Sequence, residues 1–157
     1  MSFETTAWIR HHLPLFWAVG LPLYLVLLWL IIGGITSLLG GWRSLARYYR
    51  FRGQFPGPTW RWQSAAMRYW TRYGNVLVIG AGPEGLYLGT TFVMRVFHPP
   101  LVIPWNEIKV HMQKPMFGRL VSFHLGWQLQ IPLRVREDLG KNSRAAAGDA
   151  FPVETVV

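Results

Sequence analysis

The residues of this chain that most resemble a chemical motif are three glycines that follow an apolar run. They have the spacing G-x-G-x-x-G within Gly80-Ala81-Gly82-Pro83-Glu84-Gly85, and Glu107 lies further along the chain. In dinucleotide-binding proteins a helix begins at such glycines, its first amides bind the pyrophosphate, and an acidic residue about 20 positions later binds the ribose. The motif therefore raises the hypothesis of a flavin or nicotinamide cofactor.

The residues after the third glycine argue against that hypothesis. The segment from Leu86 to Phe97 contains β-branched and aromatic residues and an internal glycine, and it stops at Pro99-Pro100. This composition is typical of strands rather than of a helix with a period of 3.6. About 70 residues follow Gly85, too few for the rest of a doubly wound fold. We therefore expect a hairpin with its corner at Pro83-Glu84-Gly85 and no cofactor, and keep the cofactor-binding protein as a remote alternative.

Other residue types that carry chemistry are sparse. Cysteine is absent, and His98, His111 and His124 lie far apart in the sequence. Neither the acidic residues nor the histidines have the spacing of metal ligands, and the chain lacks a nucleophile elbow, a P-loop lysine and an HExxH motif. We expect no catalytic residues and no metal site, so the chain is interpreted as a non-enzymatic protein.

The strongest signal in the sequence is a long apolar segment. From Leu13 to Trp42 the chain contains no Asp, Glu, Lys, Arg or His. A membrane-spanning helix needs about 20 apolar residues. The sequence therefore predicts an N-terminal flank over residues 1–12 and a transmembrane helix over residues 13–41.

Two further features refine this prediction. Because proline is disfavoured inside a helix, Pro14 and Pro22 place the expected start of the uninterrupted helix near Pro22, with residues 13–20 either extending it through a kink or lying in the membrane interface. The apolar core of a cleaved signal peptide is about 7–15 residues long and is followed by small residues. Here the apolar run is longer and Gly40-Gly41-Trp42-Arg43 follows it. We therefore expect a retained anchor.

Basic residues are distributed unequally around the apolar segment. Arg10 is the only lysine or arginine before it, whereas Arg43, Arg47, Arg50 and Arg52 follow it closely. Because positive residues stay on the cytoplasmic side, we expect the N-terminus outside and the C-terminal domain in the cytoplasm.

Residues 42–52 read as a short basic helix next to the membrane. Arginines at steps of four and three form one stripe along it. Each arginine beside a bilayer is attracted to anionic headgroups by about 1 kcal/mol. We expect headgroup contacts from Trp42, Arg43, Arg47, Arg50 and Arg52. In the simpler interpretation, these arginines only determine topology.

A second candidate contact lies on the apolar helix itself. Gly33, Ser37 and Gly41 are four residues apart and so share one helix face. Small residues at this spacing let two membrane helices approach closely. They predict a contact with another integral membrane protein or with a second copy of the chain.

The rest of the chain has the pattern of an all-β domain. Between residues 59 and 141, short apolar runs alternate with turn residues about every 10 positions, which indicates a sandwich or partly open barrel of about seven strands. We expect strands at residues 59–69, 73–79, 86–88, 92–97, 101–103, 108–112, 120–125 and 127–133. A short helix over 134–141 is expected to close the domain, and residues 142–157 are expected to form a disordered tail.

Several of these segments resemble a group of small, uncharacterised bacterial membrane proteins with one span and a domain of pleckstrin-homology or GRAM type. The matching segments are Gly41–Ala46, Trp60–Ser64, Pro83–Leu88, His98–Ile108 and Ile131–Arg134. The chain departs from the group in its longer N-terminus and in Gly80-Ala81-Gly82. The resemblance implies about seven strands, a closing C-terminal helix and the bacterial inner membrane as location, and it implies no activity.

Three functions are compatible with these features. The first is a membrane-anchored binding or scaffold protein at the cytoplasmic face, which contacts anionic lipid headgroups or a membrane-protein partner. The second is an accessory subunit of a larger integral-membrane complex, such as an energy-converting one. The third is the cofactor-binding protein described above. Membrane tethering explains the net charge of +9 more simply than nucleic-acid binding does, so we expect no nucleic-acid partner.

Overall fold

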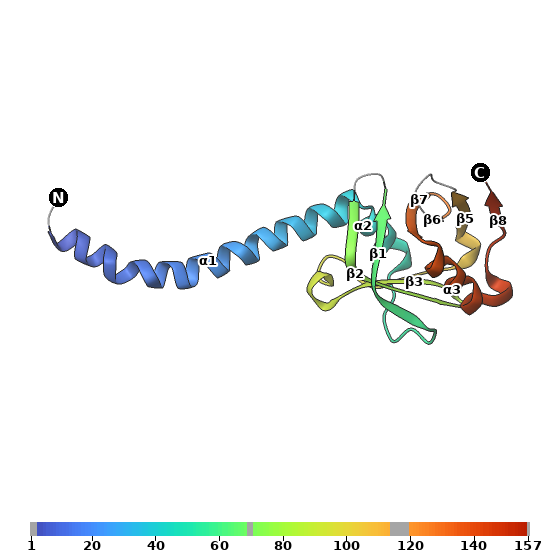
Figure 1. Ribbon diagram of the computed structural model, residues 1–157, viewed down its shortest axis with the longest axis horizontal. Helices are drawn as coiled ribbons and strands as arrows, with labels where there is room; N and C mark the ends of the chain where they lie inside the picture. The colour runs from blue at the N-terminus through green and yellow to red at the C-terminus, as the bar shows by residue number, and fades with distance from the viewer. Residues whose placement is uncertain (1–2, 69–70, 114–119, 157) are drawn as a thin grey trace. The chain divides into compact units, whose positions relative to one another are not determined.

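The computed structural model describes residues 3–68, 71–113 and 120–156 (Figure 1). The chain divides into two compact units, Met1–Ile35 and Thr36–Val157. The first unit contains most of a long helix. The second contains the end of that helix and the entire β domain.

The N-terminal helix, α1, extends from Phe3 to Leu39. Both Pro14 and Pro22 lie inside it, so the start near Pro22 is corrected, the alternative in which residues 13–20 extend the helix is the observed one, and most of the expected flank is helical. A proline removes one amide hydrogen bond, and long apolar helices tolerate this loss when the turns on both sides remain bonded. Within α1, Trp17–Leu39 has a mean hydropathy of 2.3 and is long and apolar enough to cross a membrane.

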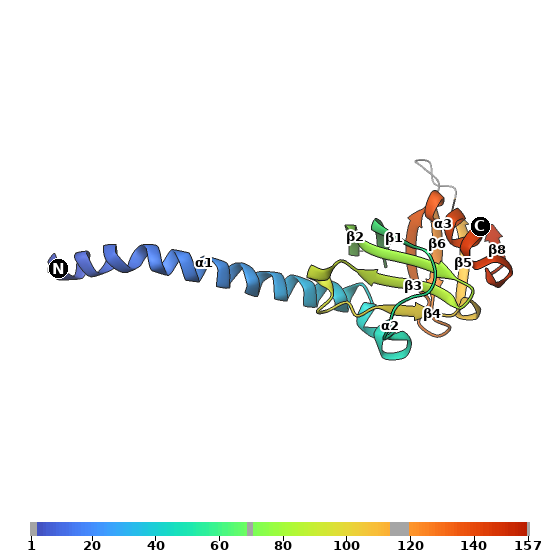
Figure 2. The ribbon, with the colours of Figure 1, turned by 90° about the horizontal axis from the view of Figure 1, so that it is seen from below.

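A short second helix, α2, extends from Trp42 to Tyr49. It is separated from α1 by Gly41, whose φ of 79° is a left-handed conformation that favours glycine. The basic helix expected over 42–52 ends early, because Arg50 adopts an extended backbone conformation and forms an isolated β-bridge with Leu101. As a result α2 packs against the strand that begins at Leu101 (Figure 2).

Seven strands form an antiparallel, nearly closed sheet. They are β1 (Thr59–Met67), β2 (Thr71–Gly82), β3 (Gly85–Thr90), β4 (Leu101–Ile103), β5 (Ile108–Gln113), β6 (Leu120–Leu125) and β7 (Ile131–Arg136). The order in the sheet is β4-β3-β2-β1-β7-β6-β5, and β8 (Glu154–Val156) adds a parallel strand beside β5. The all-β class and the closing C-terminal helix are therefore confirmed.

The glycine motif lies in a β-hairpin. Strands β2 and β3 pair from Leu77 opposite Thr90 to Gly82 opposite Gly85, and Pro83-Glu84 forms the turn. The hairpin prediction is confirmed, because a strand and not a helix begins at Gly85.

The strand expected over residues 92–97 is a turn, and the strand expected over residues 127–133 begins later, at Ile131. Residues 92–97 form a 3-10 turn, Phe92–Met94, followed by further turns in which Phe97 N–H donates to the Met94 carbonyl. Residues 127–129 also form a turn, and β7 begins at Ile131 after Gln130, whose φ is 44°. In both turns, backbone hydrogen bonds between nearby residues take the place of hydrogen bonds to a neighbouring strand. The apolar residues of the turns nevertheless have high strand propensity.

The C-terminal segment is ordered, so the expected disordered tail is corrected. Helix α3 begins at Glu137 and ends at Ala147, and both Ser143 and Ala147 are buried. Phe151 then packs on Trp105, with ring centroids 5.2 Å apart. Small residues that suggested disorder by composition are instead what lets α3 lie close to the sheet. Val157 lies outside the described residues.

The core of the domain lies between the sheet and the helices that cover it. It combines inward-facing residues of all seven strands with residues of α2 and α3. Its largest fully buried side chains include Trp42, Phe123, Leu45, Met67, Leu77, Ile79 and Leu86. The core therefore begins at the first residue of α2.

Candidate functional site

The four arginines after α1 are positioned by α2 and by the extended chain that follows it. Arg43, Arg47, Arg50 and Arg52 are all exposed. In the described part of the chain, no carboxylate lies within ion-pair distance of any of them. Their guanidinium groups are therefore available to an external anion, and their contact with lipid headgroups stays a prediction.

Trp42 has a different role from the expected one. Its side chain is completely buried, and its indole N–H donates to the Pro99 carbonyl oxygen at 2.9 Å. An indole in this position contacts the domain core and not lipid headgroups. The structure thus corrects the membrane contact that we expected for Trp42.

The stripe of small residues is divided by the fold. Ser37 is buried, and its hydroxyl donates to the Phe97 carbonyl oxygen at 2.8 Å. Gly41 lies beyond the end of α1, and a Cβ atom there would come within 2.7 Å of Ile131 Cδ1. Both residues therefore face their own domain, which corrects their expected role in a contact between helices. Gly33 belongs to the other compact unit.

A cluster of buried aromatic residues surrounds the first residues of the domain. The Trp42 ring lies 5.0 Å from the His98 ring and 5.9 Å from the Tyr73 ring, measured between centroids. The Tyr73 hydroxyl lies 3.1 Å from His98 Nε2 and 3.3 Å from the Thr36 carbonyl oxygen. Through this cluster the last turn of α1 is hydrogen-bonded to β2 and to the segment before β4.

The hydrogen bonds of His98 define its tautomer. Nδ1 lies 3.1 Å from the Met94 carbonyl oxygen, which can only accept, so Nδ1 carries the proton. Nε2 is then an acceptor, and the single proton of the Tyr73 hydroxyl can be donated to Nε2 or to the Thr36 carbonyl oxygen. Burial lowers the pKa of His98 and raises the pKa of Tyr73, so both side chains are held in their neutral forms.

A cleft of about 520 Å³ lies beside α2. It is bordered by the end of α2, the turn before β5 and the turn before β7. Its lining residues are Tyr48, Tyr49, Asn106, Glu107, Trp127, Gln128 and Leu129. The sequence gives no hint of this cleft, because the lining comes from three segments that are distant along the chain.

Within the cleft, the Tyr49 hydroxyl donates a hydrogen bond to Glu107 Oε2. Burial, followed by the hydrogen bond and charge of Glu107, raises the pKa of Tyr49 to about 12. The ammonium group of Lys109 lies 5.5 Å from the ring centroid of Trp127. Aromatic faces and one carboxylate suit the cleft to binding a polar group, and the lining contains no histidine that could act with Glu107 as an acid–base pair.

The three histidines of the domain do not converge. His111 and His124 contact each other across β5 and β6, with ring centroids 4.8 Å apart, whereas His98 lies in the cluster around Trp42. In the described part of the chain, no three histidine or acidic side chains are placed to share a metal ion. Burial, and then the positive charges around it, lower the pKa of His124.

Comparisons with known proteins give no assignment. No protein-family model, curated protein or solved structure matches this chain. The function is therefore inferred from the chain's own residues.

Proposed function

We propose that this protein is a non-enzymatic binding or scaffold module anchored by α1 in the bacterial cytoplasmic membrane, and that its arginines bind anionic lipid headgroups. The proposal rests on one observation. An exposed apolar helix of membrane-spanning length ends at Leu39, and exposed arginines without carboxylate partners in the described structure begin at Arg43. An apolar surface followed at once by uncompensated positive charge is the surface that an anionic bilayer complements.

The exposure of the helix supports this role. Only 6 % of the most apolar stretch is buried, whereas the core helix of a water-soluble protein would be mostly covered. An exposed apolar surface of this length needs a lipid environment or a partner to cover it.

The end of the helix supports a retained anchor. Ser37 in the last turn of α1 donates to Phe97, and Trp42 fills the core directly after it. Removing a leader at this boundary would take away groups on which the folded domain depends. Cleavage after Leu39 would therefore destabilise the domain, which favours retention of the helix.

The distances along the chain favour direct headgroup contact. Arg43 follows Leu39 by four residues, a span of at most about 14 Å when fully extended. The screening length at physiological ionic strength is about 8 Å, so the attraction between Arg43 and anionic lipids depends on Arg43 lying well inside that upper bound, and added salt weakens it. Each arginine is expected to contribute about 1 kcal/mol.

We assign the domain to the pleckstrin-homology or GRAM type as part of the same proposal. Seven antiparallel strands followed by a C-terminal helix agree with what the resembling segments imply. The excess of arginine after the span favours a cytoplasmic domain. The accessory-subunit alternative is less well supported, because Ser37 and Gly41 contact their own domain.

The proposal is tested with the full chain reconstituted in bilayers that contain spin-labelled lipids. The wild-type chain is expected to enrich labelled anionic lipid over labelled zwitterionic lipid, and high salt is expected to weaken the enrichment. A variant with Arg43, Arg47, Arg50 and Arg52 changed to Gln is expected to lose most of it. The control changes four exposed basic residues away from the helix end, Arg61, Lys109, Arg136 and Lys141, and therefore removes the same charge.

Enrichment that survives in the first variant, or that falls equally in the control, contradicts headgroup binding through α2. Orientation is checked separately with Gln128→Cys, because the chain has no other cysteine. A membrane-impermeant maleimide should label this residue only after the cells are lysed. Labelling of intact cells would overturn the cytoplasmic placement.

A further inference from the structure

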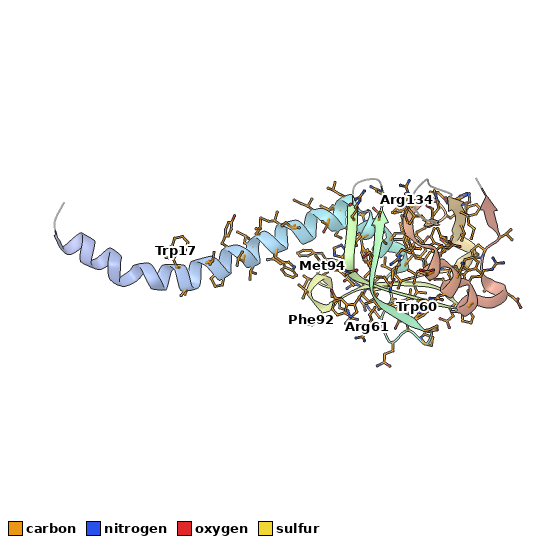
Figure 3. All side chains as sticks on the ribbon, in the orientation of Figure 1. Trp17, Trp60, Arg61, Phe92, Met94 and Arg134 are labelled. Atoms are coloured by element: carbon orange, nitrogen blue, oxygen red, sulfur yellow. The ribbon has the colours of Figure 1, made fainter. Side chains whose placement is uncertain are left out.

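The segment between β3 and β4 presents apolar side chains to the outside. In this segment, which we call the Thr91–His98 loop, Phe92 is 87 % exposed, Val93 59 % and Val96 67 %. Figure 3 shows Phe92 and Met94 on this loop. Such a concentration of exposed apolar residues in one short loop is uncommon on a surface that faces only water.

The backbone of the loop is largely satisfied by its own hydrogen bonds. The amides of Met94, Arg95 and Phe97 donate to the carbonyls of Thr91, Phe92 and Met94 respectively. The Thr91 amide donates to Val76 in β2. Because lipid cannot supply hydrogen bonds, these internal bonds reduce the number of backbone groups of the loop that must stay in contact with water at the membrane boundary.

The loop is held at the level of the last turn of α1. Ser37 in that turn donates to the Phe97 carbonyl oxygen at 2.8 Å. Buried His98 bonds Met94 on one side and the Tyr73 hydroxyl on the other, which fixes the loop to the domain. A loop joined to the end of a membrane-spanning helix lies where hydrocarbon meets the headgroups.

We infer that the Thr91–His98 loop is a second membrane contact, in which Phe92, Val93 and Val96 enter the boundary between headgroups and acyl chains. The inference rests on the proposed function, because α1 must span the bilayer for its last turn to mark this depth. Arg95 is exposed and long enough to reach the phosphates while its neighbours enter the apolar layer. The occupant of this surface is therefore the bilayer itself, continuous with the lipid around α1.

This loop would complete a two-sided attachment. The arginines of α2 bind headgroup phosphates by charge, and the loop binds by apolar burial. Two separate contacts of the domain with the membrane would restrict its tilt more than one contact does.

Depth-dependent fluorescence quenching tests the inference on the full chain in lipid nanodiscs. Because the chain has no cysteine, single changes Val93→Cys and Val96→Cys can each carry one environment-sensitive dye. Lipids with a quencher at known acyl-chain positions then report the depth of the dye. We expect the dye at both positions to lie about 5–10 Å into the boundary between headgroups and acyl chains.

Two reference positions separate the possible outcomes. Val153→Cys is the matched control, since Val153 is 91 % exposed but lies outside the loop, and its dye should not be quenched. Ile31→Cys reports the span, and its dye should be quenched at greater depth. Quenching at position 31 without quenching at 93 and 96 overturns the loop contact and leaves the anchor intact. Absence of quenching at position 31 overturns the proposed anchor itself.

A charge substitution provides a second, independent measurement. Phe92→Glu in the Val96→Cys background should reduce quenching of the dye at position 96, since a carboxylate resists transfer into the apolar layer. The same charge at Val153, combined with Val96→Cys, should leave the quenching unchanged. Equal quenching in the two charge variants would show that apolar burial of the loop does not occur.

Discussion

The side chain of His98 is titratable, but its role in this structure is to join the Thr91–His98 loop to the β domain. It is completely buried, contacts Trp42 and Tyr73, and bonds the loop through the Met94 carbonyl. Both ring nitrogens are used, one as donor and one as acceptor. A protonated ring would carry a positive charge, and complete burial against Trp42 and Tyr73 makes that charge costly.

Acid should therefore destabilise the domain through His98. Burial lowers the pKa of His98 below its ordinary value of 6.5, so the unfolded chain binds the proton more readily than the folded chain. The stabilisation is present above pH 6.5 and is lost as the pH falls through the lowered pKa. His98→Gln is expected to cost about 1–3 kcal/mol near neutral pH through lost hydrogen bonds, but to reduce the acid dependence of unfolding.

Chemical denaturation of the full chain in detergent, repeated from pH 7.5 to about 5, measures this effect. The pKa of His124 is also lowered, so His124→Gln is the matched control that keeps the contribution of His98. A His98→Gln variant with the same acid dependence as wild type would disprove the assignment.

At the scale of the element, the glycine motif is explained by close packing of strands. A Cβ atom on Gly85 would collide with the carbonyl oxygen of Ile103, and it would lie 2.8 Å from the Ile103 carbonyl carbon and 3.1 Å from Pro104 Cα. A Cβ atom on Gly80 would lie 2.9 Å from Thr59 Cγ2 and 3.0 Å from the Pro58 carbonyl oxygen. These glycines let the backbone of the β2–β3 hairpin approach neighbouring backbone closely. In nucleotide-binding loops the same glycines let the backbone approach a pyrophosphate instead.

The hairpin provides a matched pair of substitutions. Gly85→Ala is expected to destabilise the chain by about 3 kcal/mol, because the atoms in the way belong to backbone that cannot rotate aside. Gly74→Ala in β2 meets nothing within 4 Å and should change stability little. Thermal unfolding of both variants in detergent compares the two. Equal melting temperatures would contradict the packing explanation.

At the scale of the whole molecule, the boundary between the compact units falls inside α1. The division after Ile35 leaves the last helical turn with the β domain, where Ser37 donates to Phe97. The segment from Thr36 to Trp42 thus continues the apolar run of the anchor in the sequence, but it packs as part of the β domain in the structure.

Two truncations test this boundary. A chain that starts at Thr36 retains Ser37 and Trp42 and should fold. A chain that starts at Arg43 lacks the buried indole, whose loss alone is expected to cost about 3–5 kcal/mol. Denaturant unfolding should therefore show the longer chain to be clearly more stable. Similar stability of the two chains would mean that the domain does not depend on the end of the helix.

The sequence by itself determined those features that depend on local composition and period. The charge-free segment from Leu13 predicted a helix of membrane-spanning length, and the run of strand and turn signals from Thr59 predicted an all-β domain. The choice of a hairpin over a nucleotide-binding turn at Gly85 also followed from local propensity. Each of these features is set by neighbouring residues, so the pattern of one short segment contains the information.

Only the tertiary structure decided which surfaces those elements use. Trp42 has the composition of a membrane-boundary residue but fills the core, whereas the apolar residues around Phe92 have the composition of a strand but are exposed. The cleft at Glu107 and the order of the C-terminal tail depend on residues far apart in the chain. A buried position and an exposed one can have the same local sequence, because burial is determined by the partner that packs against it.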